Sequence, residues 1–357
     1  SAVNGAANPF FRPGVAKNPL VIENFYGNYT NISTNQLLVF DLVFSGDTSI
    51  ELGGGEVKWA AGYQYRWNRD KNEYGDLFNN EVTPCIDSVT DGTPVCGAPN
   101  GPLIFFGSNA NFDADRAIWA VFGEVLVPVL DNLEFNLAIR HEDYPGGIGS
   151  TTNPKVAARW QVTDFLALRG SVSTTFRAPT IAQASPICAV GVALLGGQYR
   201  AVRTCGNTAL KPETADTYNV GALVEFGGFR ASIDYFNFSF KDELTAESAS
   251  RLFATMFPTG AAAQCGLTEL ASRFQFAGGV CSAANVLRVD VNNVNGPSTK
   301  TSGFDVRAEY NFDDFLMGDT RWQVGAEATY LLEYKRGAFT LNGAPQIEFA
   351  AAEDRAG

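Results

Sequence analysis

The chain has 357 residues, a formal net charge of -12 and a single histidine. This acidic balance argues against nucleic acid as a partner, because phosphate binding needs clustered lysines and arginines. No run of about 18 apolar residues occurs, so the sequence contains no transmembrane helix. A mean hydropathy near zero still permits membrane strands, because a barrel strand turns its polar half toward the lumen.

Segments of alternating apolar and polar residues dominate the chain after residue 37. Between 133 and 142, and again between 166 and 177, apolar side chains take every second position and polar ones take the rest. A side-chain period of two predicts strands that have one apolar and one polar face. About eleven such strands are expected, at 37–44, 56–68, 116–127, 133–142, 153–162, 165–176, 214–226, 229–240, 302–312, 321–334 and from Pro345 onward.

Short and long connections alternate between these strands. Tight turns are expected at 128–132, 163–164, 227–228 and 313–320, all on one side of the sheet. Residues 1–36 are interpreted as a surface loop, and long loops are expected at 69–114, 178–213 and 241–287, the last with helical pieces near 246–257 and 267–275. This asymmetry is typical of a transmembrane β-barrel, whose long loops are extracellular. The predicted fold class is therefore all-β, with antiparallel strands in a transmembrane β-barrel; a soluble sandwich or solenoid with unusually long strands is the alternative.

Six cysteines fall as three pairs, and each pair lies inside one long loop. The pairs are Cys85 and Cys96, Cys188 and Cys205, and Cys265 and Cys281. Zinc binding is a poor fit, because no C-x-x-C motif occurs and only one histidine is present. We predict three disulfides that each close one loop, which places the loops in an oxidising compartment.

Several segments together resemble TonB-dependent outer-membrane receptors. The resemblance is carried by Asn-Pro-Lys-Val-Ala-Ala-Arg-Trp at 153–160, by 168–179 with its final Phe-Arg-Ala-Pro, and by 120–128, 210–218 and 301–307. It implies that residues 1–357 are part of a barrel, with the barrel strands at 37–350, and about half of a roughly 22-stranded whole. It also implies a plug domain inside the lumen, which is absent from this sequence, so we interpret the chain as a segment of a longer protein.

The resemblance implies an outer-membrane active transporter and receptor. Such a protein takes up a scarce substrate of the siderophore, cobalamin or oligosaccharide class with energy from the TonB complex of the inner membrane. The expected partners are outer-membrane lipid, the protein's own plug domain, TonB and the small-molecule or oligosaccharide substrate. A passive porin-like or adhesive barrel is the alternative. No enzyme activity and no cofactor are expected, because His141 is the only imidazole and no Gly-x-Ser-x-Gly element accompanies any serine.

Charged residues on the polar faces of the strands are the candidates for contact with the plug or the substrate. Arg177 is the strongest single candidate, because it lies where a strand enters a long loop. The candidates are Arg140, Arg159, Arg169, Arg177, Arg230, Asp305, Arg307 and Glu327. A salt-bridged barrel wall would produce the same pattern. Aromatic residues of the opposite face, including Tyr218, Tyr235, Tyr330 and Tyr334, are predicted to contact lipid.

Overall fold

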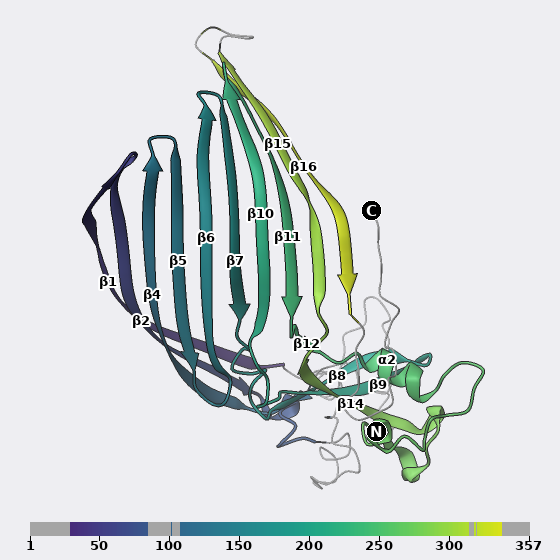
Figure 1. Cartoon of the computed structure of the whole chain (residues 1–357). Coiled ribbons are helices and arrows are strands. Elements are labelled where there is room, and N and C mark those ends of the chain that lie inside the picture. The colour runs from purple at the N-terminus through teal and green to yellow at the C-terminus, as the bar shows by residue number, and fades with distance from the viewer. Residues whose placement is uncertain (1–28, 85–100, 102–107, 314–317, 319, 338–357) are drawn as a thin grey trace.

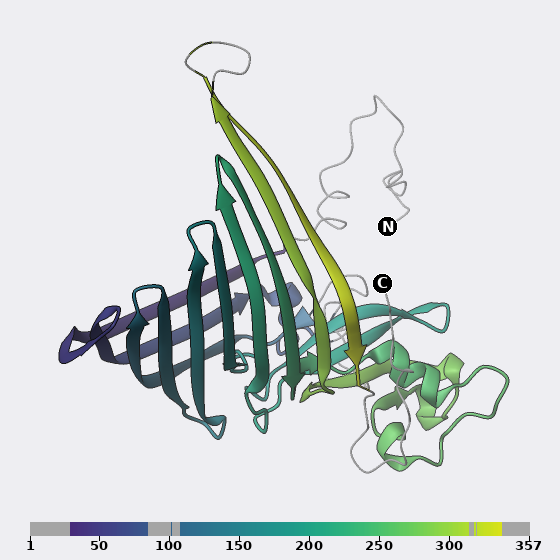
Figure 2. The same ribbon diagram turned by 45° about the horizontal axis from the view of Figure 1, so that its top comes forward.

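The structure is a computed structural model that describes residues 29–84, 101, 108–313, 318 and 320–337. Most of these residues form one large, curved sheet of long strands (Figure 1). A smaller sheet with short helices lies at one end of the large sheet, where the long connections meet (Figures 1 and 2). We call this smaller unit the cap; it is built from residues 108–109, 188–205 and 244–295.

The ten strands of the large sheet are all antiparallel to their neighbours and follow chain order, interrupted only by strands of the cap. They are β1 (Asn31–Leu52), β2 (Gly55–Tyr74), β4 (Phe112–Leu130), β5 (Leu133–Tyr144), β6 (Gly149–Thr163), β7 (Leu166–Arg177), β10 (Glu213–Phe226), β11 (Phe229–Lys241), β15 (Thr299–Asp313) and β16 (Arg321–Arg336). These confirm ten of the eleven predicted strands; the eleventh, from Pro345 onward, lies outside the described residues. Among those residues β1 and β16 each pair on one side only, so the sheet is an open wall.

Several strands are longer than the alternation of their side chains predicts. β1 begins at Asn31, inside the predicted 1–36 loop, and continues beyond the predicted strand end at 44 to Leu52. The polar residues at its start pair in register with the end of β2, where Asn31 lies opposite Tyr74. Main-chain hydrogen bonds do not depend on side-chain polarity, so pairing carries the strands beyond their apolar stretch. The first long connection is shorter than predicted for the same reason.

The predicted tight hairpin at residues 227–228 is confirmed. Gly227 and Gly228 have φ values of 53° and 84° and join β10 directly to β11. Two successive positive φ values are what a two-residue type I′ turn requires, and glycine adopts them at little steric cost. The short turns lie at one end of the sheet and the cap lies at the other (Figure 1). The predicted alternation of short and long connections is therefore present in the fold.

The prediction that 178–213 and 241–287 are loops, with helical pieces in the second, is wrong, because both ranges contribute strands to the cap. Its strands are β3 (Ser108–Asn109), β8 (Cys188–Leu195), β9 (Gln198–Cys205), β12 (Leu244–Ala246), β13 (Phe274–Phe276) and β14 (Val286–Asn295). β8 and β9 form a hairpin, and β14 pairs with β9 in parallel, so the two predicted loops share one sheet. The α-helices of the cap are α2 (Ala249–Met256) and α3 (Thr268–Ala271), and its short 3-10 turns occupy Ala277–Gly279 and Ala283–Asn285. A further 3-10 turn, Asp76–Phe78, lies outside the cap and follows β2.

A hydrophobic core holds the cap together. Met256, Leu270 and Val289 are fully buried there, and they come from α2, α3 and β14. Arg200 closes one edge of this core, where its guanidinium donates to the carbonyls of Val286 and Ala283. Burial lowers the pKa of Arg200, and the two carbonyls compensate for its desolvation. The cap is thus a small folded unit in its own right and not a set of independent loops.

Two of the three predicted disulfides are confirmed within the cap. Cys188 bonds to Cys205 across the ends of the β8–β9 hairpin, and Cys265 bonds to Cys281. The third predicted pair, Cys85 and Cys96, lies outside the described residues. In the chain-entropy account, closing loops of this length stabilises the fold by roughly 3 kcal/mol each.

Candidate functional site

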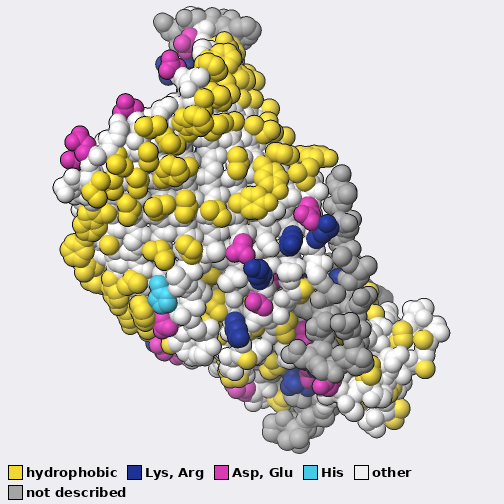
Figure 3. All heavy atoms as spheres, viewed as in Figure 1, with side chains coloured by type: hydrophobic (Ala, Val, Ile, Leu, Met, Phe, Trp, Pro, Cys, Tyr) yellow, Lys and Arg dark blue, Asp and Glu magenta, His cyan; other side chains and the backbone are white. Residues whose placement is uncertain are grey.

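Exposed apolar side chains cover one face of the large sheet (Figure 3). Val220, Ile233, Val306 and Val324 lie on this outer face of neighbouring strands, and each exposes more than two fifths of its surface. A soluble monomer rarely exposes a continuous apolar surface of this extent, because contact with water is costly. The outer face therefore fits contact with lipid.

Two aromatic rows bound this apolar surface. At the turn end, the rings of Phe226 and Phe229 lie 5.4 Å apart. At the cap end, Tyr235 lies 5.9 Å from Tyr218 and 5.4 Å from Phe304. Residues 218 and 226 are about 27 Å apart along a strand, or about 20 Å in height after a tilt of about 40°. This height is close to the apolar band of outer-membrane barrels, which is flanked by aromatic girdles.

One predicted member of the lipid-facing aromatic set is wrong. Tyr330 lies opposite Phe304 on the outer face, as predicted, but Tyr334 lies opposite Thr301 on the inner face. A register shift between these two pairs inserts one extra residue into β16. One extra residue moves every later side chain to the other face of the sheet.

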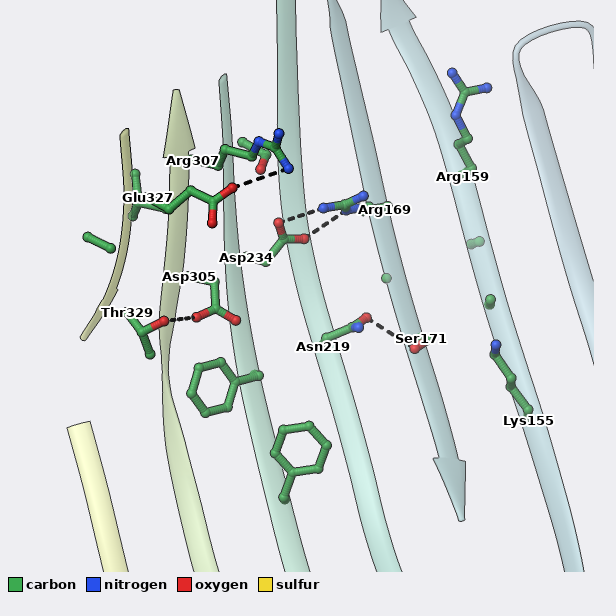
Figure 4. Close-up of a pocket in the computed structure, with 18 residues that line it drawn as sticks. Lys155, Arg159, Arg169, Ser171, Asn219, Asp234, Asp305, Arg307, Glu327 and Thr329 are labelled. Carbon is green, nitrogen blue, oxygen red and sulfur yellow. Dashed lines mark hydrogen bonds and ion pairs between the residues drawn. The ribbon is translucent and has the colours of Figure 1, made fainter. Parts of the chain in front are cut away.

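All eight predicted candidate residues lie on the inner face. Directly paired residues share a face, and the pairs Arg159–Arg169 and Arg307–Glu327 each join two candidates across neighbouring strands. Six strands from β6 to β16 line a hollow of about 890 Å³ on this face, which is therefore the concave side of the wall. Figure 4 shows five of the candidates around it: Arg159, Arg169, Asp305, Arg307 and Glu327.

Ion pairs and hydrogen bonds tie together the later strands of the hollow. Arg169 donates to both oxygens of Asp234, from Nε at 2.7 Å and from Nη2 at 2.6 Å (Figure 4). Thr329 donates to Asp305 at 2.6 Å, and Arg307 forms an ion pair with Glu327 at 3.3 Å. Two arginines face three carboxylates here, so this side of the hollow has no surplus of positive charge.

The β6 side of the hollow is different. Arg159 donates to the amide oxygen of Gln161 at 2.9 Å, and Lys155 lies on the same strand (Figure 4). Within the described ranges, no carboxylate lies at ion-pair distance from either cation. Arg159 also lies directly opposite Arg169, and like charges at directly opposed positions destabilise a sheet. On its other side Arg159 lies directly opposite Glu134, so it stands between one like and one opposite charge without forming an ion pair with the latter.

The inner face also carries a ladder of phenylalanines, which the alternation of apolar and polar residues did not predict. Phe236, Phe238 and Phe240 follow one another along β11, with ring centroids 5.7 Å and 6.2 Å apart. Phe236 and Phe238 line the hollow. The signal that could have revealed the ladder is the pair Asn237 and Ser239, because these polar residues occupy the outer positions beyond Tyr235. The polarity of the two faces is reversed at this end of the strand.

Arg177, the strongest predicted candidate, joins the wall to the cap. Its Nε and Nη2 each donate to Glu213 at 2.8 Å, and Nη2 also donates to the carbonyl of Leu244 at 3.2 Å. Glu213 in turn accepts a hydrogen bond from the Leu244 amide at 2.8 Å. Residues of β7, β10 and β12 therefore meet at one charged junction.

Arg140 and Arg230 also take part in ion pairs of the wall. Arg140 donates to Glu142, a nearly buried carboxylate that also accepts from Arg66 at 2.7 Å and from the Tyr144 hydroxyl at 2.6 Å. Arg230 pairs with Glu225 and, at 3.8 Å, with Glu309. These contacts match the salt-bridged wall that the sequence left open as the second interpretation.

Other kinds of site are sparse in the part of the chain that the structure describes. None of its helices is long and apolar enough to cross a membrane. The same residues contain no group of three or more His, Cys, Asp or Glu side chains placed to hold a metal ion. His141 has a threonine neighbour, Thr152, at 2.8 Å from its Nδ1.

The apolar outer face, the charged inner face, the aromatic rows and the short turns gathered at one end of the sheet define a class of protein. The structure is a segment of a transmembrane β-barrel. The chain belongs to the family described as TonB dependent receptor-like, beta-barrel, whose sequence profile matches residues 3–352. TonB-dependent receptors are proteins of the outer membrane, and the protein is therefore located there. They are receptors and transporters rather than enzymes.

Two curated proteins are similar to parts of the chain. An iron-regulated outer membrane virulence protein of Vibrio cholerae is 32% identical over 117 residues, which cover 32% of this chain and 17% of that protein. A probable TonB-dependent siderophore receptor, PirA of Acinetobacter baumannii, is 24% identical over 174 residues, or 48% of this chain and 22% of that protein. The chain thus matches less than a quarter of the length of each relative.

Solved structures share the fold. The ferric enterobactin receptor PfeA of Pseudomonas aeruginosa superposes with a TM-score of 0.58 at 16% identity, over 84% of this chain and 36% of that one. The siderophore receptor PirA of Acinetobacter baumannii superposes with a TM-score of 0.55 at 17% identity, over 88% and 38%. The wall seen here is comparable to one part of such a receptor.

Proposed function

We propose that this segment is part of the wall of an outer-membrane receptor that takes up a siderophore-type substrate with energy from the TonB complex. The observation that carries the proposal is the two-faced wall, apolar outside and charged around a hollow inside, in a member of the TonB-dependent receptor family. The names of the similar proteins point to iron and siderophores. Cobalamin and oligosaccharides are the other substrate classes to be tested.

The inner face supports a second part of the proposal, which concerns the plug domain. Arg159 and Lys155 have no carboxylate at ion-pair distance among the described residues, although Glu134 lies opposite Arg159 in the strand register, whereas Arg169 is held by Asp234. We assign to Arg159 and Lys155 the binding of a carboxylate from the plug. The two carboxylates of Asp305 and Glu327, with Arg307 between them in charge, form the opposite wall of the same space. In this arrangement the plug is held on one side only, which suits a domain that must move during transport.

Uptake by living cells tests the function. A strain without the gene of the full receptor is compared with the complemented strain for uptake of labelled ferric siderophores, cobalamin and maltodextrins, with and without TonB. We expect one ferric siderophore to accumulate only when both the receptor and TonB are present. Uptake that persists without TonB would instead identify a passive porin-like barrel, the alternative function.

The plug contact is tested by a double variant, Lys155→Gln with Arg159→Gln, in the full receptor. Loss of both cations should increase passive ion conductance through the barrel, because the plug is held less firmly. The matched control is Lys58→Gln with Arg321→Gln, which removes two exposed cations near the turn end of the wall. Equal conductance of the two double variants would contradict the assigned contact.

A further inference from the structure

An apolar strip interrupts the polar inner face beside the hollow. Its members come from two strands: Phe236, Phe238 and Phe240 follow one another along β11, and Leu331 and Tyr334 lie on the inner face of β16. Phe238, Leu331 and Tyr334 expose 37%, 44% and 38% of their surface. Contact with a water-filled lumen is unfavourable for these side chains, and an exposed apolar patch with a polar rim commonly marks a binding surface. We call these five residues the apolar strip.

The inner residues of β15, which runs between the two rows, are small. Gly303 lies opposite Phe236, and a side chain at its position would begin 2.9 Å from the tip of the Phe236 ring. Glycine therefore lets this ring lie over β15. Thr301 lies between Phe238 and Tyr334, because it is paired with one residue on each side. These two rings thus flank a single small residue, and the Phe236 ring lies next to them.

A β-bulge places Tyr334 in the apolar strip. Between its pairs with Phe304 and Ser302, β16 has one residue more than β15, and that residue, Leu332, has no partner in the register. Strict alternation from the outer Tyr330 would put Tyr334 on the lipid side, whereas the bulge puts it on the lumen side. Bulges are common next to active sites, where they redirect a side chain in this way.

The apolar strip leads from the cap to the hollow. Phe240 lies next to the end of β11, where the chain enters the cap, whereas Phe236 and Phe238 line the hollow. The next inner residues of β15 and β16 toward the turn end, Asp305 and Thr329, also line the hollow (Figure 4). In an outer-membrane barrel the end with the long connections is extracellular. A solute that enters from outside therefore meets the apolar strip before it reaches the hollow.

The dimensions and chemistry of the apolar strip fit a flat aromatic ring. β11 and β16 are two strand spacings apart, or roughly 10 Å, because β15 alone lies between them. A ring in contact with apolar atoms on both sides needs roughly 7–8 Å between those atoms, twice the usual carbon–carbon contact distance. An α-helix with its side chains is roughly 10–12 Å wide and would not enter. No charged residue belongs to the strip, and the hydroxyls of Thr301 and Tyr334 can bind polar substituents of a ring.

We propose that Phe238 and Tyr334 hold an aromatic ring of the transported substrate on its way from the cap to the hollow. This role rests on the proposed uptake function and narrows the substrate to an iron complex whose ligand carries aromatic rings. The rings of Phe236, Phe238 and Phe240 follow at 5.7 Å and 6.2 Å, so a substrate ring that leaves one contact meets a similar one next to it. A single ring–ring contact is weak, and the substrate can therefore move on.

Two neutral iron complexes with the same chelating group serve as probes. Tris(benzohydroxamato)iron(III) carries phenyl rings, and tris(acetohydroxamato)iron(III) carries methyl groups in their place. Binding of each complex to the full receptor in detergent micelles is measured by equilibrium dialysis with radioactive iron, which requires neither cells nor TonB. The test variant is Phe238→Leu with Tyr334→Leu, which keeps apolar side chains but removes both rings. The matched control is Phe226→Leu with Tyr310→Leu, which removes one phenyl and one phenol group from exposed positions of the outer face. Circular dichroism verifies that each variant is folded.

The unaltered receptor should bind the phenyl complex roughly tenfold more tightly than the methyl complex, because a phenyl ring buries more apolar surface. The test variant should bind the phenyl complex roughly tenfold more weakly, because two ring–ring contacts are lost, and should bind the methyl complex as before. The control should bind both complexes like the unaltered receptor. Equal affinity for the two complexes, or equal losses in the test variant and the control, would overturn the proposal.

Two further outcomes separate this site from the plug and from the uptake function. Unchanged binding by the test variant, together with increased ion conductance through the barrel, would overturn the proposal and assign the apolar strip to the plug. Uptake that does not depend on TonB would contradict the proposed function alone, because the binding measurement is made without transport.

Discussion

Replacing Glu142 with glutamine removes the charge from a carboxylate that three donors share on the inner face. Arg66, Arg140 and the Tyr144 hydroxyl all bind this side chain, which is only 5% exposed. Breaking a buried ion pair by removing one partner costs about 3–5 kcal/mol. The two arginines are about one third exposed, so water compensates for part of the loss. We therefore expect Glu142→Gln to lower the free energy of unfolding by about 2 kcal/mol.

The measurement is equilibrium unfolding of the full receptor in urea, followed in micelles by tryptophan fluorescence. The matched control is Glu225→Gln, which breaks the pair with Arg230 on the same face, where both side chains are more than half exposed. That change should cost less than about 1 kcal/mol, as exposed pairs do. Equal destabilisation by the two variants would refute the reasoning. It would show that burial of the Glu142 carboxylate does not increase the free energy of unfolding that is lost with its charge.

A turn, a disulfide and a bulge each give one further prediction. Gly228→Ala should destabilise the protein by about 1–2 kcal/mol, because Gly228 has a positive φ and an added Cβ would lie 2.4 Å from the Asn311 carbonyl oxygen. Gly227→Asn should be nearly neutral in the same unfolding assay, because asparagine tolerates a positive φ and nothing lies within 4 Å of the added Cβ. Cys188→Ser with Cys205→Ser should make residues 188–205 sensitive to protease while the wall stays resistant, and a hairpin that remains protected would contradict the role of the disulfide. Leu332 has no partner in the register of β15 and β16, so its deletion should remove the bulge and leave position 335 opposite Lys300 on the outer face; a cysteine introduced there as Lys335→Cys should still react with a lipid-anchored thiol reagent, and loss of labelling would contradict the bulge.

The wall was predictable because each of its strands carries its own signal. Alternation is a local property. The sequence of β7 alone shows which of its side chains lie on the apolar face and which lie on the polar face. The inner position of Arg169 and Arg307 followed from the same parity. The junction of Arg177 with Glu213 and Leu244 did not, since it depends on how a cap strand meets the wall.

The cap was not predictable because its contacts join distant parts of the chain. Arg203 of β9 donates to Asp290 of β14 at 2.6 Å, across 87 positions of sequence. Its strands are also short, and a strand such as β12 has three residues, too few to show a period. The bulge at Leu332 was hidden for a related reason, because one unpaired residue leaves the sequence pattern intact and reverses only the facing of the residues after it.

The parallel pairing of β14 with β9 has a consequence for engineering. An exchange of loops between receptors cannot treat these two extracellular segments as separate cassettes. Here a donor segment that replaces 178–213 alone would leave β14 with an exposed edge and would open the shared core at Val289. Residues 178–213 and 241–298 should therefore be transplanted together, so that β9 and β14 keep their pairing and their common core.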